Sequence, residues 1–493
     1  MLLSRVSKLS ALILLLLIVQ LPVYVSHFIR AVLDPDIYWH LRVGEWILRN
    51  HTFPQVGIFS QYAQGHGWIA YSWGFEVLMA WLFRFAGLAA IPVALGVARA
   101  VIAFTIFVVL LCLSQRFWLS WLVTAAALFP LSSILVIRPV LFTILFFTIE
   151  IGLIFQARRR GSVKPLYWLP LLFLVWANVH IQFVYGLFLL ALYAACELLN
   201  RIFRGEKSSW ISRCPIDTPA IRIILISLLS FCVTFLGPYG ARTYFVIFHY
   251  AGNTSTYNQI TELLALGFRD WGDYFVVILL MAVCFSLGRK GIDLFTGSLI
   301  FSAAMVSFRS SRDAWFIVLV CAALIAEAAR GDEVESSPMR TAWHLQYAAA
   351  FVLAVTAAFG YAERVGLTPQ NLIGAVDSFY PVRATEYVRD HHLPGPMYNS
   401  FNWGGFLIFN LREYPVSIDG RNDLYGPAVG ERVRNTMQGI DWKSDPGLAR
   451  ANFVLIERGD TLAKLLAIDP DFKLVYADNL AVIFTRNHPV PSE

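Results

Sequence analysis

Charged residues are scarce in this chain. Asp, Glu, Lys and Arg make up 15% of its 493 residues, whereas hydrophobic residues make up 57%. Soluble globular chains carry about 25% charged residues, and a mean hydropathy of +0.60 lies well outside their usual range. The composition therefore excludes an ordinary soluble protein and predicts an α-helical protein that crosses a membrane several times.

The sequence also lacks paired cysteines and the common nucleotide-binding and hydrolase motifs. Its six cysteines include no Cys-x-x-Cys pair, and none of them follows Gly360. We therefore expect neither a disulfide framework nor a thiolate metal site. P-loop, Gly-x-Gly-x-x-Gly and Gly-x-Ser-x-Gly elements do not occur where a strand leads into a helix, so these motifs support no function.

The net charge of +6 is arranged as in a membrane protein. Lys and Arg lie in short loops between hydrophobic runs, as in the group from Arg158 to Lys164. Basic residues mark the cytoplasmic side of a membrane, and this spacing leaves no nucleic-acid surface. We predict a cytoplasmic N-terminus and no nucleic-acid partner.

Hydrophobic runs of roughly 17 to 25 residues predict about eleven membrane spans. They cover residues 9–31, 91–113, 117–136, 139–157, 165–178, 183–200, 219–237, 271–288, 292–308, 313–330 and 342–361. The first run is too long for a signal peptide and lacks a small-x-small cleavage site, so we predict a retained signal anchor. An odd number of spans places the C-terminal residues outside the cytoplasm.

The composition changes near Tyr361, where we predict a domain boundary. Residues 1–361 would form the transmembrane domain, with a first outer loop over 32–90, and residues 362–493 a small extracytoplasmic α/β domain. In this tail, short apolar runs alternate with helical patterns. They predict strands at 397–399, 416–419, 452–456, 472–477 and 480–485, and helices at 383–391, 403–411, 427–437 and 461–468.

The first outer loop begins with two carboxylates, Asp34 and Asp36, at the membrane surface. Pro35 between them fixes its own φ and disfavours helix at Asp34, so the loop starts in a defined shape. A carboxylate there could act as a general base or hold a metal ion. His40 lies one helical turn beyond Asp36, and the two together could bind a divalent metal or relay a proton. Alternatively, Asp36 only caps the helix that starts near Tyr38.

Three arginines near the outer ends of spans are candidates for binding phosphate: Arg138, Arg309 and Arg312. Guanidinium groups bind phosphate bidentately and remain charged in apolar surroundings. The alternative is that these side chains only snorkel to the membrane rim. Snorkelling explains Arg138 less well than the other two arginines. Basic residues concentrate on the cytoplasmic side of a membrane, and Arg138 is predicted on the outer side.

Other polar residues interrupt the hydrophobic pattern at the same predicted face. Asn178, His180 and Gln182 alternate with apolar residues in the connection between two predicted spans. Such an interruption of the hydrophobic pattern is tolerated only beside water or protein, so these side chains could recognise sugar hydroxyls. The remaining candidates for sugar or acceptor binding are Glu76, Tyr239 and Glu262. Because ionisable groups at membrane depth line cavities or pair, we expect the polar groups of the outer connections to form one site. Simple polarity of loop ends is the alternative.

Several segments together resemble one group of membrane proteins. The longest, residues 34–47, reads DPDIYWHLRVGEWI, and the others are residues 73–76, 138–142, 176–180, 237–240, 309–313, 398–407 and 418–426. As a set they are similar to uncharacterised bacterial membrane proteins grouped with the GT-C glycosyltransferases. These are relatives of the protein O-mannosyltransferases and of the aminoarabinose transferase that modifies lipid A.

The resemblance implies a GT-C-like multi-span fold in a bacterial inner membrane, with an extracytoplasmic active site. It also implies a lipid-linked sugar phosphate as donor and a catalytic aspartate in the first outer loop, which maps to Asp36 or Asp34. The expected activity is transfer of a sugar from a polyprenyl-phosphate donor to a glycan, lipid or protein acceptor. If a divalent metal ion takes part, Asp36 and His40 are its expected ligands.

Two other classes of function remain open. A transporter or flippase for lipid-linked glycans would be favoured by broken helices or a two-fold repeat, and the sequence shows neither clearly. An assembly or binding protein would work through its C-terminal part, where residues 419–423 have the polar density of a small site. An ordinary turn explains this density equally well.

Overall fold

The computed structural model of the protein describes residues 28–62, 65–202, 220–252, 263–288, 291–330 and 367–490. The chain divides into two compact units. The first unit comprises residues 1–27, 93–240 and 260–365, and the second comprises residues 28–92, 241–259 and 366–493. Residues of the predicted first outer loop therefore belong to the same unit as the C-terminal residues. The predicted domain boundary at residue 361 stays a prediction.

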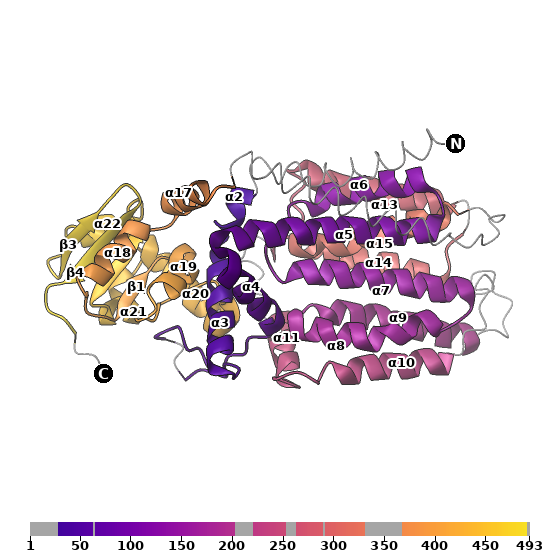
Figure 1. Cartoon of the computed structure of the whole chain (residues 1–493), viewed down its shortest axis with the longest axis horizontal. Helices are drawn as coiled ribbons and strands as arrows, with labels where there is room; N and C mark the ends of the chain where they lie inside the picture. The colour runs from indigo at the N-terminus through magenta and orange to yellow at the C-terminus, as the bar shows by residue number, and fades with distance from the viewer. Residues whose placement is uncertain are drawn as a thin grey trace. The chain divides into compact units, whose positions relative to one another are not determined.

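The described part of the first unit is helical, and its long helices lie side by side with roughly parallel axes (Figure 1). The helices are α5 (Ala90–Ser114), α6 (Phe117–Leu131), α7 (Val140–Arg160), η3 (Lys164–Trp168), α8 (Leu169–Val179), α9 (Phe183–Ile202), α10 (Ala220–Val233), α13 (Trp271–Gly288), α14 (Leu294–Arg309), η5 (Ser311–Asp313) and α15 (Ala314–Ala328). Helix α15 is buried along most of its length and packs against α6, α7, α13 and α14. It is the central helix of this unit.

The helices of the first unit occupy every predicted span that lies within the described residues. Four helices of the described chain are long and apolar enough to cross a membrane: Trp73–Ser114, Val140–Arg160, Phe183–Ile202 and Trp271–Gly288. The predicted span 342–361 and almost all of the predicted span 9–31 lie outside the described residues. The total of about eleven spans was counted from hydrophobic runs long enough to cross a bilayer, and this total stays a prediction.

A basic turn at the end of α7 joins several helices of the first unit. The helix ends at Gly161, whose φ of 59° is the left-handed conformation that glycine adopts readily. Arg159 donates hydrogen bonds to the carbonyl oxygens of Cys112 and Leu113, the last turn of α5, at 2.9 and 2.8 Å. Arg158 pairs with Asp293, the N-cap residue of α14, at 2.9 Å. Arg159 thus satisfies carbonyl groups at the end of α5, and Arg158 holds the aspartate that caps α14.

The second unit combines helices with a four-stranded sheet. Its helices are α2 (Phe28–Ala31), α3 (Pro35–Asn50), α4 (Trp73–Ala86), η2 (Gly87–Ala89), α11 (Arg242–Gly252), α17 (Pro369–Phe379), α18 (Val382–Asp390), η6 (Phe401–Trp403), α19 (Gly404–Asn410), α20 (Asn422–Met437), η7 (Trp442–Ser444), α21 (Pro446–Arg450) and α22 (Thr461–Leu466). Its strands are β1 (Met397–Asn399), β2 (Phe453–Glu457), β3 (Phe472–Ala477) and β4 (Ala481–Arg486).

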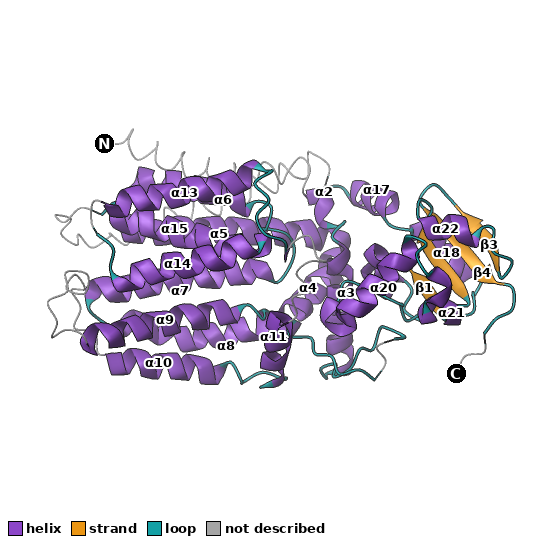
Figure 2. Ribbon diagram, turned by 180° about the vertical axis from the view of Figure 1, so that it is seen from behind, coloured by secondary structure: helices purple, strands orange, loops and turns teal. Residues whose placement is uncertain are grey.

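The sheet has the strand order β1-β2-β4-β3 and lies among α18, α21 and α22 (Figure 2). Strand β1 is parallel to β2, and the other two pairs are antiparallel. Buried side chains of β1, β2, β4 and α22 form one hydrophobic core, with Tyr398, Val454, Leu462 and Phe484 among its members. This part of the chain is an α/β arrangement, as the alternating pattern predicts.

Most elements predicted for the C-terminal residues are confirmed, and one is wrong. The four strands and the helices α18, α19, α20 and α22 lie at the predicted positions. The strand predicted at 416–419 does not form, and only Val416 makes an isolated bridge, to Ser60. The polar side chains of this segment make other bonds instead: the hydroxyl of Ser417 donates to Oδ1 of Asn399 in β1, and Asp419 accepts from Arg421.

Within the second unit, α3 packs against both α4 and α19. Glycines make the close contacts possible, because a Cβ on Gly44 would lie 2.0 Å from the carbonyl oxygen of Glu76, and a Cβ on Gly405 2.2 Å from that of Pro35. The backbone of Val416 exchanges hydrogen bonds with Phe59 and Gln61 at 3.0 and 3.1 Å. Residues 28–92 are thus built into one compact body with the C-terminal residues.

Candidate functional site

Helix α3 begins after a capping aspartate, Asp34, so the two carboxylates Asp34 and Asp36 have different structural roles. Asp34 is the N-cap residue, with φ −69° and ψ 117°, and its Oδ1 accepts a hydrogen bond from the backbone N–H of Asp36 at 3.0 Å. Pro35 occupies the first helical position, where its missing N–H costs nothing. The alternative in which Asp36 caps the helix is therefore wrong: Asp34 is the cap.

The carboxylate of Asp36 is partly buried and lies beside the indole of Trp39. Trp39 donates a hydrogen bond from Nε1 to Oδ1 of Asp36 at 3.2 Å. The same indole contacts the imidazole of His40, with ring centroids 3.6 Å apart and the ring planes tilted by 31°. Trp39 therefore contacts both residues that the sequence places on one face of this helix.

His40 forms a buried pair with Glu76 of α4. Nδ1 of His40 lies 3.2 Å from Oε1 of Glu76, and both side chains are almost fully buried. The ring of Phe75 meets the imidazole edge-on at 5.2 Å. The structure thus brings together three predicted site residues, Asp36, His40 and Glu76, near Trp39, which was not among the predicted site residues.

The turn over residues 419–423 is organised by a fully buried ion pair. Arg421 donates from Nε to Oδ1 of Asp419 at 2.8 Å and from Nη2 to Oδ2 at 2.7 Å, and neither side chain is exposed. Tyr425 donates its hydroxyl to Oδ2 of Asp419 at 2.6 Å. Bidentate pairing of this kind fixes the orientation of both groups.

Aromatic rings cover the guanidinium of Arg421. Its Cζ lies 5.0 Å from the ring centroid of Trp68 and 5.6 Å from that of Phe59, within range of cation–π attraction. Burial lowers the pKa of Arg421, but the charge and hydrogen bonds of Asp419 raise it further than that, so the group stays charged. Nη1 of Arg421 has no hydrogen-bond partner within the described part of the chain.

A further carboxylate, Asp423, completes the group. Trp68 donates from Nε1 to Oδ2 of Asp423 at 2.9 Å. Burial raises the pKa of Asp423 to about 6, against the opposing charge of Arg421. Arg421 and Asp423 also lie close enough to Glu76 for their charges to act on it.

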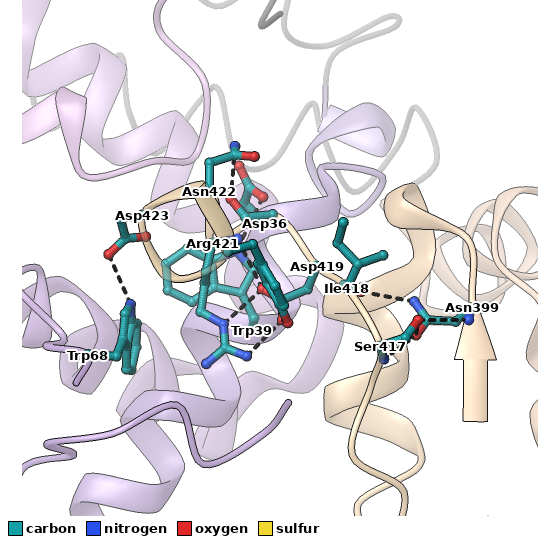
Figure 3. A network of polar contacts seen from close by, with 12 residues as sticks. Asp36, Trp39, Trp68, Asn399, Ser417, Ile418, Asp419, Arg421, Asn422 and Asp423 are labelled. Atoms are coloured by element: carbon teal, nitrogen blue, oxygen red, sulfur yellow. Dashed lines mark hydrogen bonds and ion pairs between the residues drawn. The ribbon is translucent and has the colours of Figure 1, made fainter. Parts of the chain in front are cut away.

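Figure 3 shows Asp36 and Trp39 beside the turn that carries Asp419 and Arg421, with Trp68 and Asp423 on another side. A Cβ placed on Gly420 would lie 2.0 Å from Oδ1 of Asp36, so the turn backbone touches this carboxylate directly. We call the following set the carboxylate cluster: Asp36, Trp39, His40, Trp68, Glu76, Asp419, Arg421, Asp423 and Tyr425. It offers proton acceptors, a fixed positive charge and aromatic surfaces in one place, as acid–base chemistry on a polar substrate requires.

A second polar group lies in the first unit. Thr143 of α7 contacts Nδ1 of His180 at 2.7 Å and accepts a hydrogen bond from Nε1 of Trp176 at 3.0 Å, and all three side chains are buried. Gln182 donates from Nε2 to Oδ1 of Asp313 at 3.0 Å. Arg312 lies close enough to His180 for the charge of the guanidinium to act on the imidazole. The structure therefore brings together the predicted residues His180, Gln182 and Arg312.

The other predicted residues of the first unit have more local surroundings. Asn178 donates from Nδ2 to the carbonyl oxygen of Leu174 in its own helix at 2.8 Å. Tyr239 is buried after α10, Arg138 is partly buried before α7, and Arg309 is exposed at the end of α14. Glu262 lies outside the described residues. The roles of these residues, and the convergence of both polar groups on one site, stay predictions.

The arrangement of ligand side chains bears on the expected metal site. No group of three or more His, Cys, Asp or Glu residues in the described ranges could hold a metal ion. The expected ligands Asp36 and His40 contact Trp39 and Glu76, respectively.

No protein-family model matches this sequence, and no curated protein matches it either. Its structure is similar to the apo crystal structure of the oligosaccharyltransferase of Archaeoglobus fulgidus. The TM-score is 0.52 at 11% sequence identity, and the match covers 91% of this chain and 69% of that chain. The chain therefore has a fold similar to that of an oligosaccharyltransferase. This agrees with the multi-span fold that the resemblance implies, while the GT-C superfamily and the bacterial subgroup stay predictions.

Proposed function

We propose that this protein is a membrane glycosyltransferase that moves a sugar from a polyprenyl-phosphate donor to an acceptor outside the cytoplasm. The observation that carries the proposal is the carboxylate cluster, in a chain whose fold is similar to that of an oligosaccharyltransferase. The acceptor is a hydroxyl-bearing or amide-bearing glycan, lipid or protein. The cell membrane of a bacterium is its proposed place of action.

Asp36 is the proposed general base. Its carboxylate takes the proton of the acceptor group while the acceptor atom forms a bond to the anomeric carbon of the sugar. The bond between that carbon and the phosphate oxygen breaks, and polyprenyl phosphate leaves with the electron pair. The cap made by Asp34 supports this assignment, because it shows that Asp36 is not the residue that caps α3. The N–H of Trp39 holds that carboxylate from one side.

The first unit would supply the donor site. Arg312, together with Arg138 and Arg309, would bind the donor phosphate, because guanidinium groups suit phosphate oxygens. His180, Gln182, Asn178, Tyr239 and Glu262 would line the sugar and acceptor positions. The contacts that His180 and Gln182 already make with Thr143 and Asp313 would hold their side chains in fixed orientations. Glu76 and His40 would support Trp39 behind the base.

Replacement of Asp36 by Asn tests the proposal directly. Purified full-length protein in lipid vesicles would receive undecaprenyl phosphate carrying one radiolabelled sugar at a time: mannose, glucose, galactose or 4-amino-arabinose. We expect the parent protein to release label from at least one donor, and Asp36→Asn to lower the rate by roughly 100-fold or more, the usual contribution of a general base.

Asp377→Asn is the matched control, because Asp377 is an exposed aspartate of α17 in the same unit. It should retain the parent rate. Full activity of Asp36→Asn would remove the base assignment. Absence of transfer and of donor hydrolysis by the parent protein with all four donors would overturn the proposed activity.

A further inference from the structure

The contact between Gly420 and Asp36 joins the C-terminal residues to the proposed general base. A Cβ on Gly420 would lie 2.0 Å from Oδ1 of Asp36, 3.2 Å from its Cγ and 3.4 Å from Nε1 of Trp39. Real Cβ atoms essentially never lie within 3.0 Å of a heavy atom outside their own residue and its chain neighbours, so a side chain at position 420 requires a shift, and the nearest atom is a carboxylate oxygen of Asp36. The φ of Gly420 is not in the positive region, so this position requires glycine for space and not for conformation.

The turn that carries Gly420 is held from both sides. After it, Arg421 is fixed by two hydrogen bonds to Asp419, and the N–H of Asn422 bonds to the carbonyl oxygen of Gly420 at 2.9 Å. Before it, Asn399 donates from Nδ2 to the carbonyl oxygen of Ile418 at 2.9 Å. A backbone held in this way cannot easily yield to the carboxylate that it touches.

The helix that carries Asp36 is fixed against the same C-terminal segment. A Cβ on Gly405 would lie 2.2 Å from the carbonyl oxygen of Pro35 and 3.3 Å from Cδ1 of Trp39. Trp39 donates to Oδ1 of Asp36, the oxygen that lies nearest to Gly420. The carboxylate is therefore bracketed between an indole N–H on its own helix and the backbone of the C-terminal turn (Figure 3).

We propose that Gly420, held by the buried Asp419–Arg421 pair, is a positioning residue that sets the direction of the Asp36 carboxylate. The C-terminal residues would then contribute to the reaction by orienting the base, whether or not they also bind an acceptor. This inference rests on the proposed function, in which Asp36 takes the proton of the acceptor. In an ordinary turn, the glycine of an Asp-Gly-Arg sequence would only shape the backbone. Here Gly420 would also orient the Asp36 carboxylate.

The test compares Gly420→Ala with Gly459→Ala in the full-length protein, using the donor that the parent accepts. Gly459 is a matched control because a Cβ there meets nothing within 4 Å and its φ is not positive. A displacement of about 1 Å in a reacting group costs on the order of 100-fold in rate. We expect Gly420→Ala to lower kcat by that amount, with KM for the donor within about twofold of the parent, since donor binding is left intact. Gly459→Ala should match the parent.

A second measurement reports the contact without any activity. In thermal unfolding, Gly420→Ala should lower the Tm in the parent and lose most of this effect in the Asp36→Ala background, where the added methyl group finds space. An equal Tm loss in both backgrounds would overturn the contact. If Gly420→Ala alone fails to fold, recovery of folded protein in the double variant supports the inference, and failure of both variants to fold overturns it.

The outcomes separate this inference from the proposed function. An inactive Asp36→Asn with a fully active Gly420→Ala would overturn the positioning role and leave the base assignment intact. A fully active Asp36→Asn would overturn both. A fall in kcat with unchanged KM for Gly420→Ala, together with an inactive Asp36→Asn, supports both.

Discussion

Trp68 and Asp423, which are 355 positions apart in the sequence, share a hydrogen bond of 2.9 Å. The bond joins the predicted first outer loop to the turn that also carries Arg421. The ring of Trp68 lies against the guanidinium of Arg421, so one side chain contacts both charges of this turn. The loop and the C-terminal residues thus share a polar core as well as an apolar one.

The raised pKa of Asp423 leads us to expect that the stability of the protein depends on pH. Its pKa of about 6 in the folded protein lies above the ordinary value of 3.8. Folding therefore favours the protonated form, and Asp423 destabilises the protein increasingly as the pH rises from about 4 to 6. Asp423→Asn keeps an acceptor for Trp68 and removes the charge. We expect it to raise the free energy of unfolding by about 1 kcal/mol at pH 7, a value reduced for partial exposure.

The gain from Asp423→Asn should disappear near pH 4, where the parent carboxyl is protonated. Thermal unfolding of the full-length protein in detergent at pH 4, 5, 6 and 7 would show a Tm difference that grows with pH. Asp377→Asn, at an exposed site, should show no such trend. A constant difference between parent and Asp423→Asn over this range would contradict the assigned pKa.

Two arginines that pair with carboxylates in the second unit should differ strongly in their effect on stability. Arg421 is fully buried with Asp419, and Arg421→Ala would leave a buried unpaired carboxylate, at a cost of about 3–5 kcal/mol. Arg412 also pairs through two bonds of 3.0 Å, with Glu45, but 39% of its side chain is exposed. Arg412→Ala should cost at most ~1 kcal/mol. Similar Tm losses for the two variants would contradict this burial argument.

Asp34 is predicted to act as a helix cap and not as the base. Asp34→Ala should lower the free energy of unfolding by about 1 kcal/mol, because it removes the acceptor for the N–H of Asp36. Asp34→Asn should keep both the cap and the transferase rate. Asp460 provides the control, since it is an N-cap residue whose side chain makes no capping bond, and Asp460→Ala should cost less. Loss of activity in Asp34→Asn with normal stability would give Asp34 a chemical role.

The sequence predicted local elements well because their signals are local. Strands 397–399 and 472–477 form as short apolar runs. The helix expected to start near Tyr38 begins at Pro35 instead, after the cap Asp34, because an Asp-Pro pair is itself a typical start of a helix. Helix α17 was missed although Thr368 caps it and Pro369 follows, which is the same kind of signal. Alternation predicts a strand at residues 416–419, because it cannot show that Ser417 bonds to Asn399 of β1 and Asp419 to Arg421.

The candidate site was predictable only in part. The residue types and the i, i+4 spacing identified Asp36 and His40, but nothing local indicated that Glu76 would lie against His40. The contact of Gly420 with Asp36 depends on the packing of segments almost 400 positions apart, and no pattern in one sequence encodes such a contact. Residues 419–423 had attracted attention by polar density, which was a usable signal, although a turn accounted for it equally well.

Gly186 of α9 packs closely against Trp176, which belongs to the polar group of the first unit. A Cβ there would lie 2.5 Å from Oε2 of Glu150 and 2.6 Å from Cζ3 of Trp176, both fully buried. Overpacking of this kind costs about 1–3 kcal/mol. Gly186→Ala should therefore lower the Tm in detergent. Gly288→Ala, where a Cβ meets nothing within 4 Å, should leave it unchanged or slightly raised.

The same substitution should also affect donor binding if His180 contributes to the donor site. Trp176 and His180 both contact Thr143, so a shift of the indole would pass to the imidazole through one shared hydroxyl. We expect Gly186→Ala to raise KM for the donor several-fold, an effect on binding that contrasts with the kcat effect of Gly420→Ala. A lowered Tm with an unchanged KM would show that Gly186 matters for packing alone. It would also argue against His180 as a donor-binding residue, because the contacts that support His180 would then be dispensable for donor binding.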